Sequence, residues 1–141
     1  MKKISRHQMR ENAFILVFER IFNDSPVEEL LALARECSDM EITAETERMF
    51  KGVEANKAVL DEALAANLKG WTLSRISKVS LAILRLGIWE ILFCDDVPDD
   101  IVVSECVKLA TDFAYDDDIA FVNGILGTVV RGRAQEGKKQ G

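Results

Sequence analysis

The side chains best suited to binding a charged ligand gather at the N-terminal end of the chain. Residues 1–10 hold four basic side chains and no acid, together with the only histidine, His7. The basic residues are Lys2, Lys3, Arg6 and Arg10. Arg6 and Arg10 are one helical turn apart, so a helix would place them on one face, and Lys3 would join them if the helix started early. Such a face could hold the phosphates of a nucleic acid, although phosphate contacts give little sequence preference.

The charge of the chain is unevenly distributed. The formal net charge is −6, yet residues 131–141 also carry four basic side chains against one acid. The 120 residues between these two ends carry 10 basic and 23 acidic side chains, a net charge of −13. Basic ends on an acidic body suggest binding to a polyanion. Charge alone favours a plainer interpretation, in which charged termini only keep the protein in solution.

The residue types that enzymes and metal sites need do not occur in suitable patterns. His7 has no second histidine or neighbouring cysteine, and the sequence contains no P-loop or dinucleotide-binding fingerprint. The acids of residues 95–100 lack the spacing and the central glycine of a calcium loop, so we expect them to cap a helix and to face solvent. We therefore predict no catalysis, no cofactor and no metal site.

Cysteine usage and hydropathy bear on the compartment. Cys37, Cys94 and Cys106 are odd in number and lack the paired spacing of metal ligands. Two of them lie in apolar helical patterns, which is typical of reduced, buried thiols in a cytoplasmic protein. No apolar run follows the first lysines, and no stretch has the ~20 apolar residues of a membrane span. We expect a cytoplasmic protein that does not contact a membrane.

The elements that must position these residues are predicted to be helices around one central stretch. Residues 79–94, VSLAILRLGIWEILFC, carry twelve apolar side chains out of sixteen, on all sides of a helical wheel, which is the pattern of a buried helix. Gly87 within it, and Gly52 elsewhere, indicate close approach of neighbouring helices. Arg85 and Glu90 lie about 140° apart around this helix, so they cannot pair with each other and each needs another partner.

Apolar periodicity and capping residues predict the other helices. They should cover residues 6–22, a short segment after Ser25, a long helix from Thr43 to about Leu68, a short helix over 73–78, a helix that ends near Phe113, and a final helix capped by Asp118. The fold class is therefore all-α, a single domain of about seven helices packed around the central one. We assign residues 1–133 to this domain and expect residues 134–141 to be a disordered tail.

Three segments carry distinctive motifs in a fixed order. Residues 71–90 contain W…RI…AILRLGIWE, residues 96–110 read DVPDDIVVSECVKLA, and residues 121–126 read FVNGIL. Together they resemble W…RI…AILRLAIYE, DVP…INEAVELAK and FVNGVLD of the NusB family of bacterial transcription antitermination factors. Residues 50–61 add a weaker match. The resemblance extends from the basic N-terminal arm to about Val130, and several motifs in the same order make it specific.

The resemblance implies a NusB-like helical bundle without enzymatic activity. Relatives bind the boxA element of nascent ribosomal RNA leaders beside NusE, a small-subunit ribosomal protein, and the complex joins RNA polymerase. Carried over to this sequence, the RNA site centres on Lys2, Lys3, Arg6, His7 and Arg10, with Phe18, Asp117, Phe121 and Asn123 as further candidates. An aromatic ring or an amide beside the basic arm could read an unpaired base. For Asn123, helix packing with a local polar contact is an equally good interpretation.

The sequence departs from the family pattern mainly in the arm. His7-Gln8-Met9 stands where relatives commonly have arginines, and Phe18 lacks the hydroxyl of the frequent tyrosine. These departures bear on RNA affinity more than on the fold. Arg85 and Glu105 both stand at family-matching positions and each needs a partner, so we hypothesise that they form an ion pair.

Two alternatives to an antitermination factor remain open at this stage. The same helical module precedes the catalytic domain of certain ribosomal RNA cytosine methyltransferases, although this chain has no sheet domain and no Pro-Cys motif. The chain could also be a protein-interaction module that has lost RNA binding. Some relatives self-associate, so a homodimer is also possible.

Overall fold

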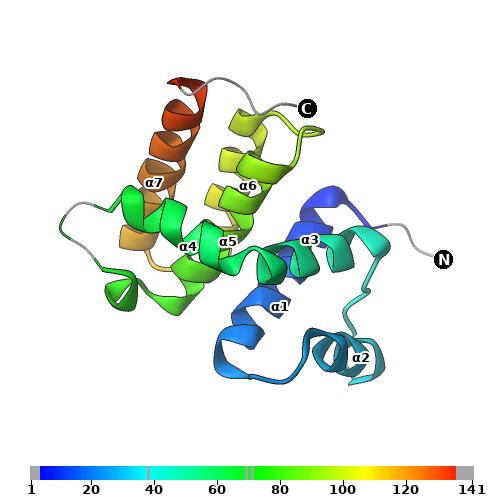
Figure 1. The fold of residues 1–141 in the computed structure, drawn as a ribbon. Coiled ribbons are helices and arrows are strands. Elements are labelled where there is room, and N and C mark those ends of the chain that lie inside the picture. Colours follow the sequence, from blue (N-terminus) through cyan, green and yellow to red (C-terminus); the bar gives the residue numbers. More distant parts are fainter. Residues whose placement is uncertain (1–3, 38, 69, 71, 136–141) are drawn as a thin grey trace.

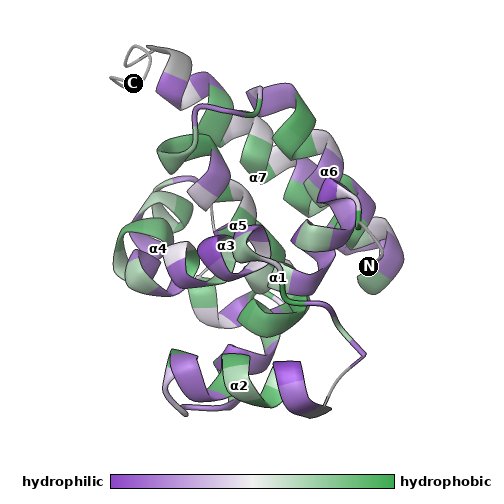
Figure 2. Ribbon diagram, turned by 90° about the vertical axis from the view of Figure 1, so that its right-hand side faces the viewer, coloured by the Kyte–Doolittle hydropathy of each residue, from purple (hydrophilic) through white to green (hydrophobic). Residues whose placement is uncertain are grey.

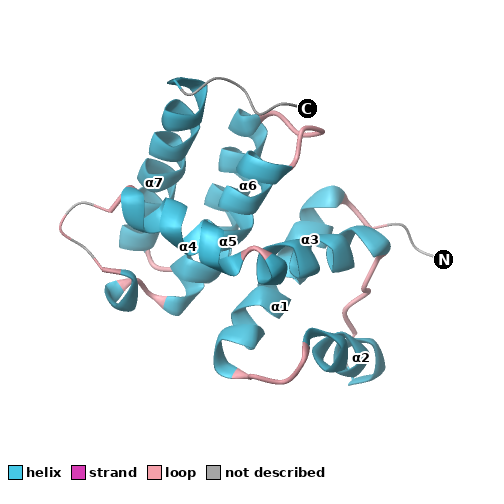
Figure 3. Ribbon diagram, viewed as in Figure 1, coloured by secondary structure: helices cyan, strands magenta, loops and turns pink. Residues whose placement is uncertain are grey.

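The computed structural model describes residues 4–37, 39–68, 70 and 72–135. Over these residues the chain forms seven α-helices and one short 3-10 helix, and no strand (Figure 3). The elements are α1 (Arg6–Phe22), α2 (Val27–Cys37), α3 (Ala44–Ala55), α4 (Lys57–Ala66), η1 (Leu73–Arg75), α5 (Lys78–Phe93), α6 (Asp99–Phe113) and α7 (Asp116–Gln135). The predicted all-α class is confirmed.

α5 is the central helix that the sequence predicted. It contacts α1, α3, α4, α6 and α7 (Figure 1). Eleven of its residues are buried, among them Leu84 and Ile88, which are fully excluded from solvent. Ser77 caps its N-terminus, because its Oγ accepts a hydrogen bond from the Ser80 N–H at 3.1 Å. An element buried on all sides explains why apolar residues surround this helix.

Most of the other helices form two groups joined by α5, and α4 packs on α5 and contacts one helix of each group, α3 and α7. α1 and α3 pack against each other on one side, and α6 and α7 pack against each other on the other (Figure 1). α2 packs on α1 and α3, and it carries both hydrophobic and hydrophilic residues, as expected of a helix with one face on the core (Figure 2). None of the described helices is long and apolar enough to span a bilayer.

Two glycines allow helices to approach closely, as the sequence predicted. A Cβ at Gly52 of α3 would lie 2.3 Å from Cε2 of Trp89 on α5. A Cβ at Gly87 of α5 would lie 2.8 Å from Sγ of Cys106 on α6. Neither position has room for a side chain. The close helix packing that each glycine allows therefore offsets the ~1 kcal/mol of helix propensity that glycine loses relative to alanine.

The long helix predicted from Thr43 to about Leu68 is wrong. α3 ends at Ala55, and α4 begins at Lys57. Between them, Asn56 has φ −113° and ψ 17°, and its side-chain amide donates to the Gly52 carbonyl at 2.8 Å. An asparagine side chain that binds a backbone carbonyl competes with the helical hydrogen bonds, and this interrupts the helix.

The hypothesis that Arg85 pairs with Glu105 is also wrong. Arg85 donates from Nε to Oδ1 and from Nη2 to Oδ2 of Asp61 on α4, both at 2.8 Å. Arg85 therefore faces α4, whereas Glu105 lies on α6 and contacts α1. Burial showed that Arg85 needed a partner, but the identity of the partner depends on which helix lies beside each face of α5.

The boundaries of three predicted elements shift by a few residues. The short helix expected over residues 73–78 is reduced to η1. α7 begins at Asp116, so Asp118 lies in its first turn, where its carboxylate accepts a hydrogen bond from the Tyr115 N–H at 3.3 Å. At its other end α7 continues to Gln135, and the rest of the expected tail, residues 136–141, lies outside the described residues.

Candidate nucleic-acid interface

Three of the N-terminal candidates, Arg6, His7 and Arg10, belong to the first turn and a half of α1. Ser5 caps the helix, because its Oγ accepts a hydrogen bond from the Gln8 N–H at 3.0 Å. The helix then places Arg6, His7 and Arg10 in fixed positions. Lys2 and Lys3 lie outside the described residues.

Arg6 is exposed but already has acidic partners. Its Nη2 donates to Oδ2 of Asp96 at 2.9 Å and lies 3.4 Å from Oε2 of Glu45, and 43% of its side chain is exposed. The hydrogen bond from Arg6 holds the pKa of Asp96 below its ordinary value, although partial burial opposes this. A ligand phosphate can reach Arg6, but it must compete with these two carboxylates.

His7 is held by α6. Its Nδ1 lies 2.6 Å from Oε1 of Glu105, whose other oxygen, Oε2, accepts a hydrogen bond from Nζ of Lys108 at 3.2 Å. Burial alone would raise the pKa of Glu105, but the hydrogen bonds from His7 and Lys108 lower it on balance. The side chains of His7 and Lys108 remain 31% and 60% exposed, so both can meet a ligand.

Arg10 is not on the surface. Only 2% of the residue is exposed, and its guanidinium forms a bidentate ion pair with Glu90 of α5. The sequence predicted that Arg10 lies beside Arg6 on an RNA-binding face, because the two are one turn apart. In the structure both guanidinium groups point toward carboxylates of the protein itself, and that of Arg10 is buried. The unpaired buried charge predicted for Glu90 was the signal that could have identified Arg10 as its partner.

Phe18 belongs to a row of aromatic rings at the edge of the core. Its ring centroid lies 6.2 Å from that of Phe14 and 5.2 Å from that of Phe22. Phe14 in turn lies 5.1 Å from Phe113 of α6. Phe18 is half-buried and packs against the core, so its main role is in packing.

The α7 candidates line two different hollows of the surface. Asp117 and the half-buried Phe121 line a cavity of about 400 Å³ together with Arg75, Ile76, Ser77 and Asp118. Asn123, which is exposed, lines a groove of about 570 Å³ with His7 and residues of α6, among them Ser104 and Lys108. Phe121 and Asn123 are separated because residues two apart lie about 200° apart around a helix. The structure thus brings Asn123 to His7, and Phe121 to Asp117.

Two basic residues beside these hollows were not singled out from the sequence. Lys108 lies on α6 beside His7, and Arg75 of η1 lines the cavity with Phe121. Both occur within the segments that carry the family motifs, but neither lies in the basic arm that drew attention. At the other basic end, Arg133 donates from Nη1 to both carboxylate oxygens of Asp99, at 2.9 and 3.0 Å, and so fixes the end of α7 to the start of α6.

Cys94 and Cys106, the cysteines whose side chains the structure describes, show no sign of an activated nucleophile. Both are buried. Complete burial raises the pKa of the Cys106 thiol far above its ordinary value, so this thiol stays protonated. The arrangement as a whole offers exposed cations, a half-buried ring and an exposed amide, which suit binding rather than bond breaking.

Comparison with known proteins identifies the family. A profile described as "NusB family" matches residues 7–131. The "Transcription antitermination protein NusB" of Clostridium novyi is 34% identical over 132 residues, which cover 91% of this chain and 99% of that protein. The protein of the same name from Nocardioides sp. is 46% identical over 88 residues, which cover 62% of this chain and 65% of its own.

Solved structures agree with the sequence comparison. NusB of T. maritima has a TM-score of 0.81 at 28% identity, covering 92% of this chain and 93% of its own. A structure of "Antitermination Factors NusB and NusE in complex with dsRNA" has a TM-score of 0.80 at 21% identity, covering 90% and 96%, and it shows a shared fold. The resemblance seen in the sequence is thereby confirmed, and this chain belongs to the NusB family of transcription antitermination factors, whose members are not enzymes.

Proposed function

We propose that this protein binds single-stranded boxA-type RNA of ribosomal RNA leaders together with NusE, as a cytoplasmic component of an RNA polymerase antitermination complex. The observation that carries the proposal is the groove at the junction of α1 and α6, which His7, Lys108 and the amide of Asn123 line together. The exposed guanidinium of Arg6 is on the residue next to His7 in the first turn of α1. Basic side chains bind the phosphates of RNA, and an amide or an aromatic ring can recognise an unpaired base by hydrogen bonding or stacking.

The charge of the remaining surface restricts where RNA can bind. The 120 residues between the two basic ends carry a net charge of −13, which repels a polyanion. Lys2, Lys3, Arg6 and His7, with Lys108 as an addition, therefore form the phosphate-binding part of the proposed site. Arg10 is not included, because its guanidinium is buried against Glu90.

A second group of residues could supply base preference. Phe121 lines a cavity beside Asp117 and Arg75, so a base that enters it would meet a ring, a carboxylate and a guanidinium. A carboxylate can accept hydrogen bonds from the amino groups of a base edge. The ring of Phe18 packs against the rings of Phe14 and Phe22, so Phe18 contributes only to the edge of the proposed site.

The need for NusE follows from the weak basic patch. Arg6 and His7 already have carboxylate partners, so RNA must replace those interactions and gains less free energy than at an unpaired cation. A second protein beside the RNA would add contacts and effective concentration. The solved relative contains NusB, NusE and double-stranded RNA together, which supports the partnership.

The test is a fluorescence anisotropy titration of three RNAs with and without NusE. The RNAs are a single-stranded boxA-like sequence, a scrambled single strand and a boxA-like duplex. We expect the boxA-like strand to bind most tightly, and only with NusE at useful strength. Equal affinity for all three RNAs would contradict sequence-specific binding. Binding of NusE without any RNA binding would instead support the interaction module that has lost RNA binding.

The methyltransferase alternative has less support. The Clostridium novyi relative, an antitermination protein by name, is matched over 99% of its own length. The cysteines that the structure describes in detail, Cys94 and Cys106, are buried and cannot serve as nucleophiles. We therefore do not pursue a catalytic role.

A further inference from the structure

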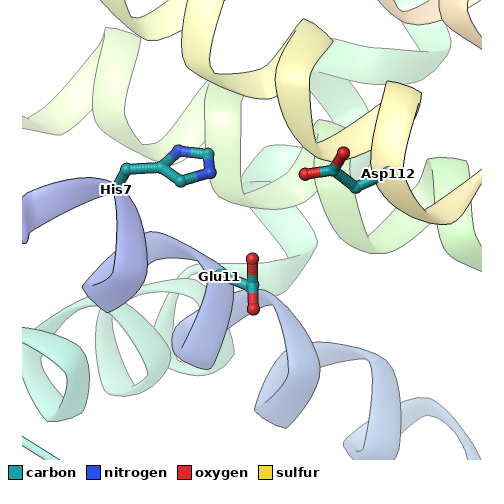
Figure 4. Close-up of side chains that lie close together, drawn as sticks. All are labelled: His7, Glu11 and Asp112. Atoms are coloured by element: carbon teal, nitrogen blue, oxygen red, sulfur yellow. The ribbon is translucent and has the colours of Figure 1, made fainter.

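Three side chains with metal-ligand chemistry converge where α1 meets α6. His7 and Glu11 are one turn apart on α1, so they share a face, and Asp112 comes from the last turn of α6 (Figure 4). One ring nitrogen of His7 and one carboxylate oxygen from each acid all lie within 4.8 Å of one another. The sequence predicted no metal site because it has a single histidine, and it could not show that two helices bring two carboxylates to it.

The imidazole of His7 is oriented as a metal ligand would be. Its Nδ1 lies 2.6 Å from Oε1 of Glu105, and an ionised carboxylate can only accept, so Nδ1 carries the proton. In the neutral ring this leaves the lone pair on Nε2. Metal-binding histidines usually donate their other N–H to a carboxylate or carbonyl in this way, which fixes the tautomer and the ring orientation.

The two acids lack a compensating positive charge. Glu11 accepts a hydrogen bond from Nε2 of Gln8 at 3.2 Å, but within the described residues no basic side chain pairs with it. Asp112 has neither a hydrogen bond nor an ion pair among those residues, and it lies at the C-terminal end of α6, where the helix dipole disfavours an anion. Lys108, the nearest base on α6 in sequence, is already paired with Glu105.

We propose that His7, Glu11 and Asp112 bind a divalent transition-metal ion, with Zn²⁺ as the best match and Glu105 holding the imidazole from behind. One imidazole nitrogen and two carboxylate oxygens are ordinary zinc ligands, and solvent completes the tetrahedron. Metal–ligand bonds of about 2.1 Å place tetrahedral ligand atoms about 3.4 Å apart, so ligand atoms that lie up to 4.8 Å apart must draw together by up to about 1.4 Å. Asp112 is exposed and can rotate to do so.

The bound ion would link the start of α1 to the end of α6. It would also neutralise the two unpaired acids beside the groove lined by His7, Asp112 and Asn123. The consequence is a local change of charge at the edge of the proposed RNA site. The metal site itself does not depend on RNA binding, and it is tested without RNA.

The experiment is isothermal titration calorimetry with ZnCl₂ on the full chain, comparing wild type with His7→Gln, Asp112→Asn and the control Glu19→Gln. Glu19 is an exposed acid on α1 outside the cluster. We expect one Zn²⁺ per chain in the wild type and in the control, and at least tenfold weaker binding in His7→Gln and in Asp112→Asn. Glu105→Gln should weaken binding by about 10- to 100-fold, because it frees the ring without removing a ligand.

Two further readouts keep the result interpretable. Far-UV circular dichroism confirms that each variant is folded, and Asp112→Asn, an exposed change, guards against a folding artefact at His7. Co²⁺ should give absorption bands of a nitrogen and oxygen site without a thiolate charge-transfer band. Absence of Zn²⁺ binding to the wild type, equal binding by all variants, or a thiolate band would each overturn the proposal.

Discussion

Arg10 and Glu90 form a buried, bidentate ion pair that joins α1 to the central helix α5. Nε of Arg10 donates to Oε2 of Glu90 at 2.8 Å, and Nη2 donates to Oε1 at 3.0 Å. Burial alone would lower the pKa of Arg10, but the hydrogen bonds and charge of Glu90 raise it on balance. Two residues predicted for different roles, one for RNA and one for the core, thus serve a single structural purpose.

The first prediction concerns this pair. Arg10→Met or Glu90→Leu alone should lower the free energy of unfolding by ~3–5 kcal/mol, because each leaves an unpaired charge in the core. The double variant should be more stable than either single variant, since apolar side chains of similar volume can replace a buried pair at little loss. Urea denaturation of the four proteins measures this cycle. Additive losses in the double variant would show that the two side chains do not act as a pair.

A second prediction concerns the packing of α5. Leu84→Ala and Ile88→Ala should each lower the free energy of unfolding by ~2–5 kcal/mol, because both side chains are fully buried and leave a cavity. Leu33→Ala on α2, where half of the residue is exposed, is the control and should change stability by less than ~1 kcal/mol. Urea melts that show small losses at both α5 positions would contradict the central role of this helix.

A third prediction compares two glycines. Gly52→Ala should destabilise by ~1–3 kcal/mol or more, because its Cβ would lie 2.3 Å from the Trp89 ring and force overpacking. Gly124→Ala on α7 has nothing within 4 Å of the added Cβ, so alanine's higher helix propensity should stabilise by up to ~1 kcal/mol. Thermal melts of the two variants should therefore shift in opposite directions. A lower melting temperature for both variants would contradict the prediction that Gly52 is required for packing and Gly124 is not.

These features mark how far the sequence could predict the fold. The buried central helix and the close approaches at Gly52 and Gly87 follow from local patterns, because an apolar wheel or a glycine in a helix reports on its immediate surroundings. The break at Asn56 was missed, since an asparagine can either stay in a helix or bind back to it. The partner of Arg85 was missed because it depends on the arrangement of whole helices.

The candidate site shows the same division. The basic residues of the arm could be found from charge, and Phe121 and Asn123 from the family motif. The sequence could not show that Arg10 turns inward, or that His7 meets Glu105 across a separation of 98 residues. Such contacts arise from the packing of α1 against α6, which no local pattern encodes.

A fourth prediction concerns acid. The pKa of Glu105 is lowered on balance by His7 and Lys108 against the effect of burial, and that of Asp96 is lowered by Arg6. A carboxyl group whose pKa is lower in the folded state stabilises the fold above its unfolded pKa, and this contribution is lost as pH falls through the folded value. Stability should therefore decrease as pH falls below the ordinary glutamate value of 4.5. In urea melts across this range, Glu105→Gln should show a weaker pH dependence than wild type, whereas Glu19→Gln should match wild type.

The last prediction tests the arm as a phosphate-binding element. If Lys2, Lys3 and Arg6 contact phosphates of single-stranded RNA, these three contacts should contribute about −2 to the slope of the logarithm of affinity against the logarithm of salt, at ~0.7 per contact. With NusE present, Arg6→Ala should flatten this slope by ~0.7 and weaken boxA-like and scrambled RNA by similar factors. Arg35→Ala is the matched control, because Arg35 is similarly exposed and also paired with an acid, but on α2. Phe121→Ala should instead weaken boxA-like RNA more than scrambled RNA, because a ring that stacks on a selected base contributes ~1–3 kcal/mol. An Arg6→Ala protein that retains both the affinity and the salt slope of the wild type would remove Arg6 from the RNA site.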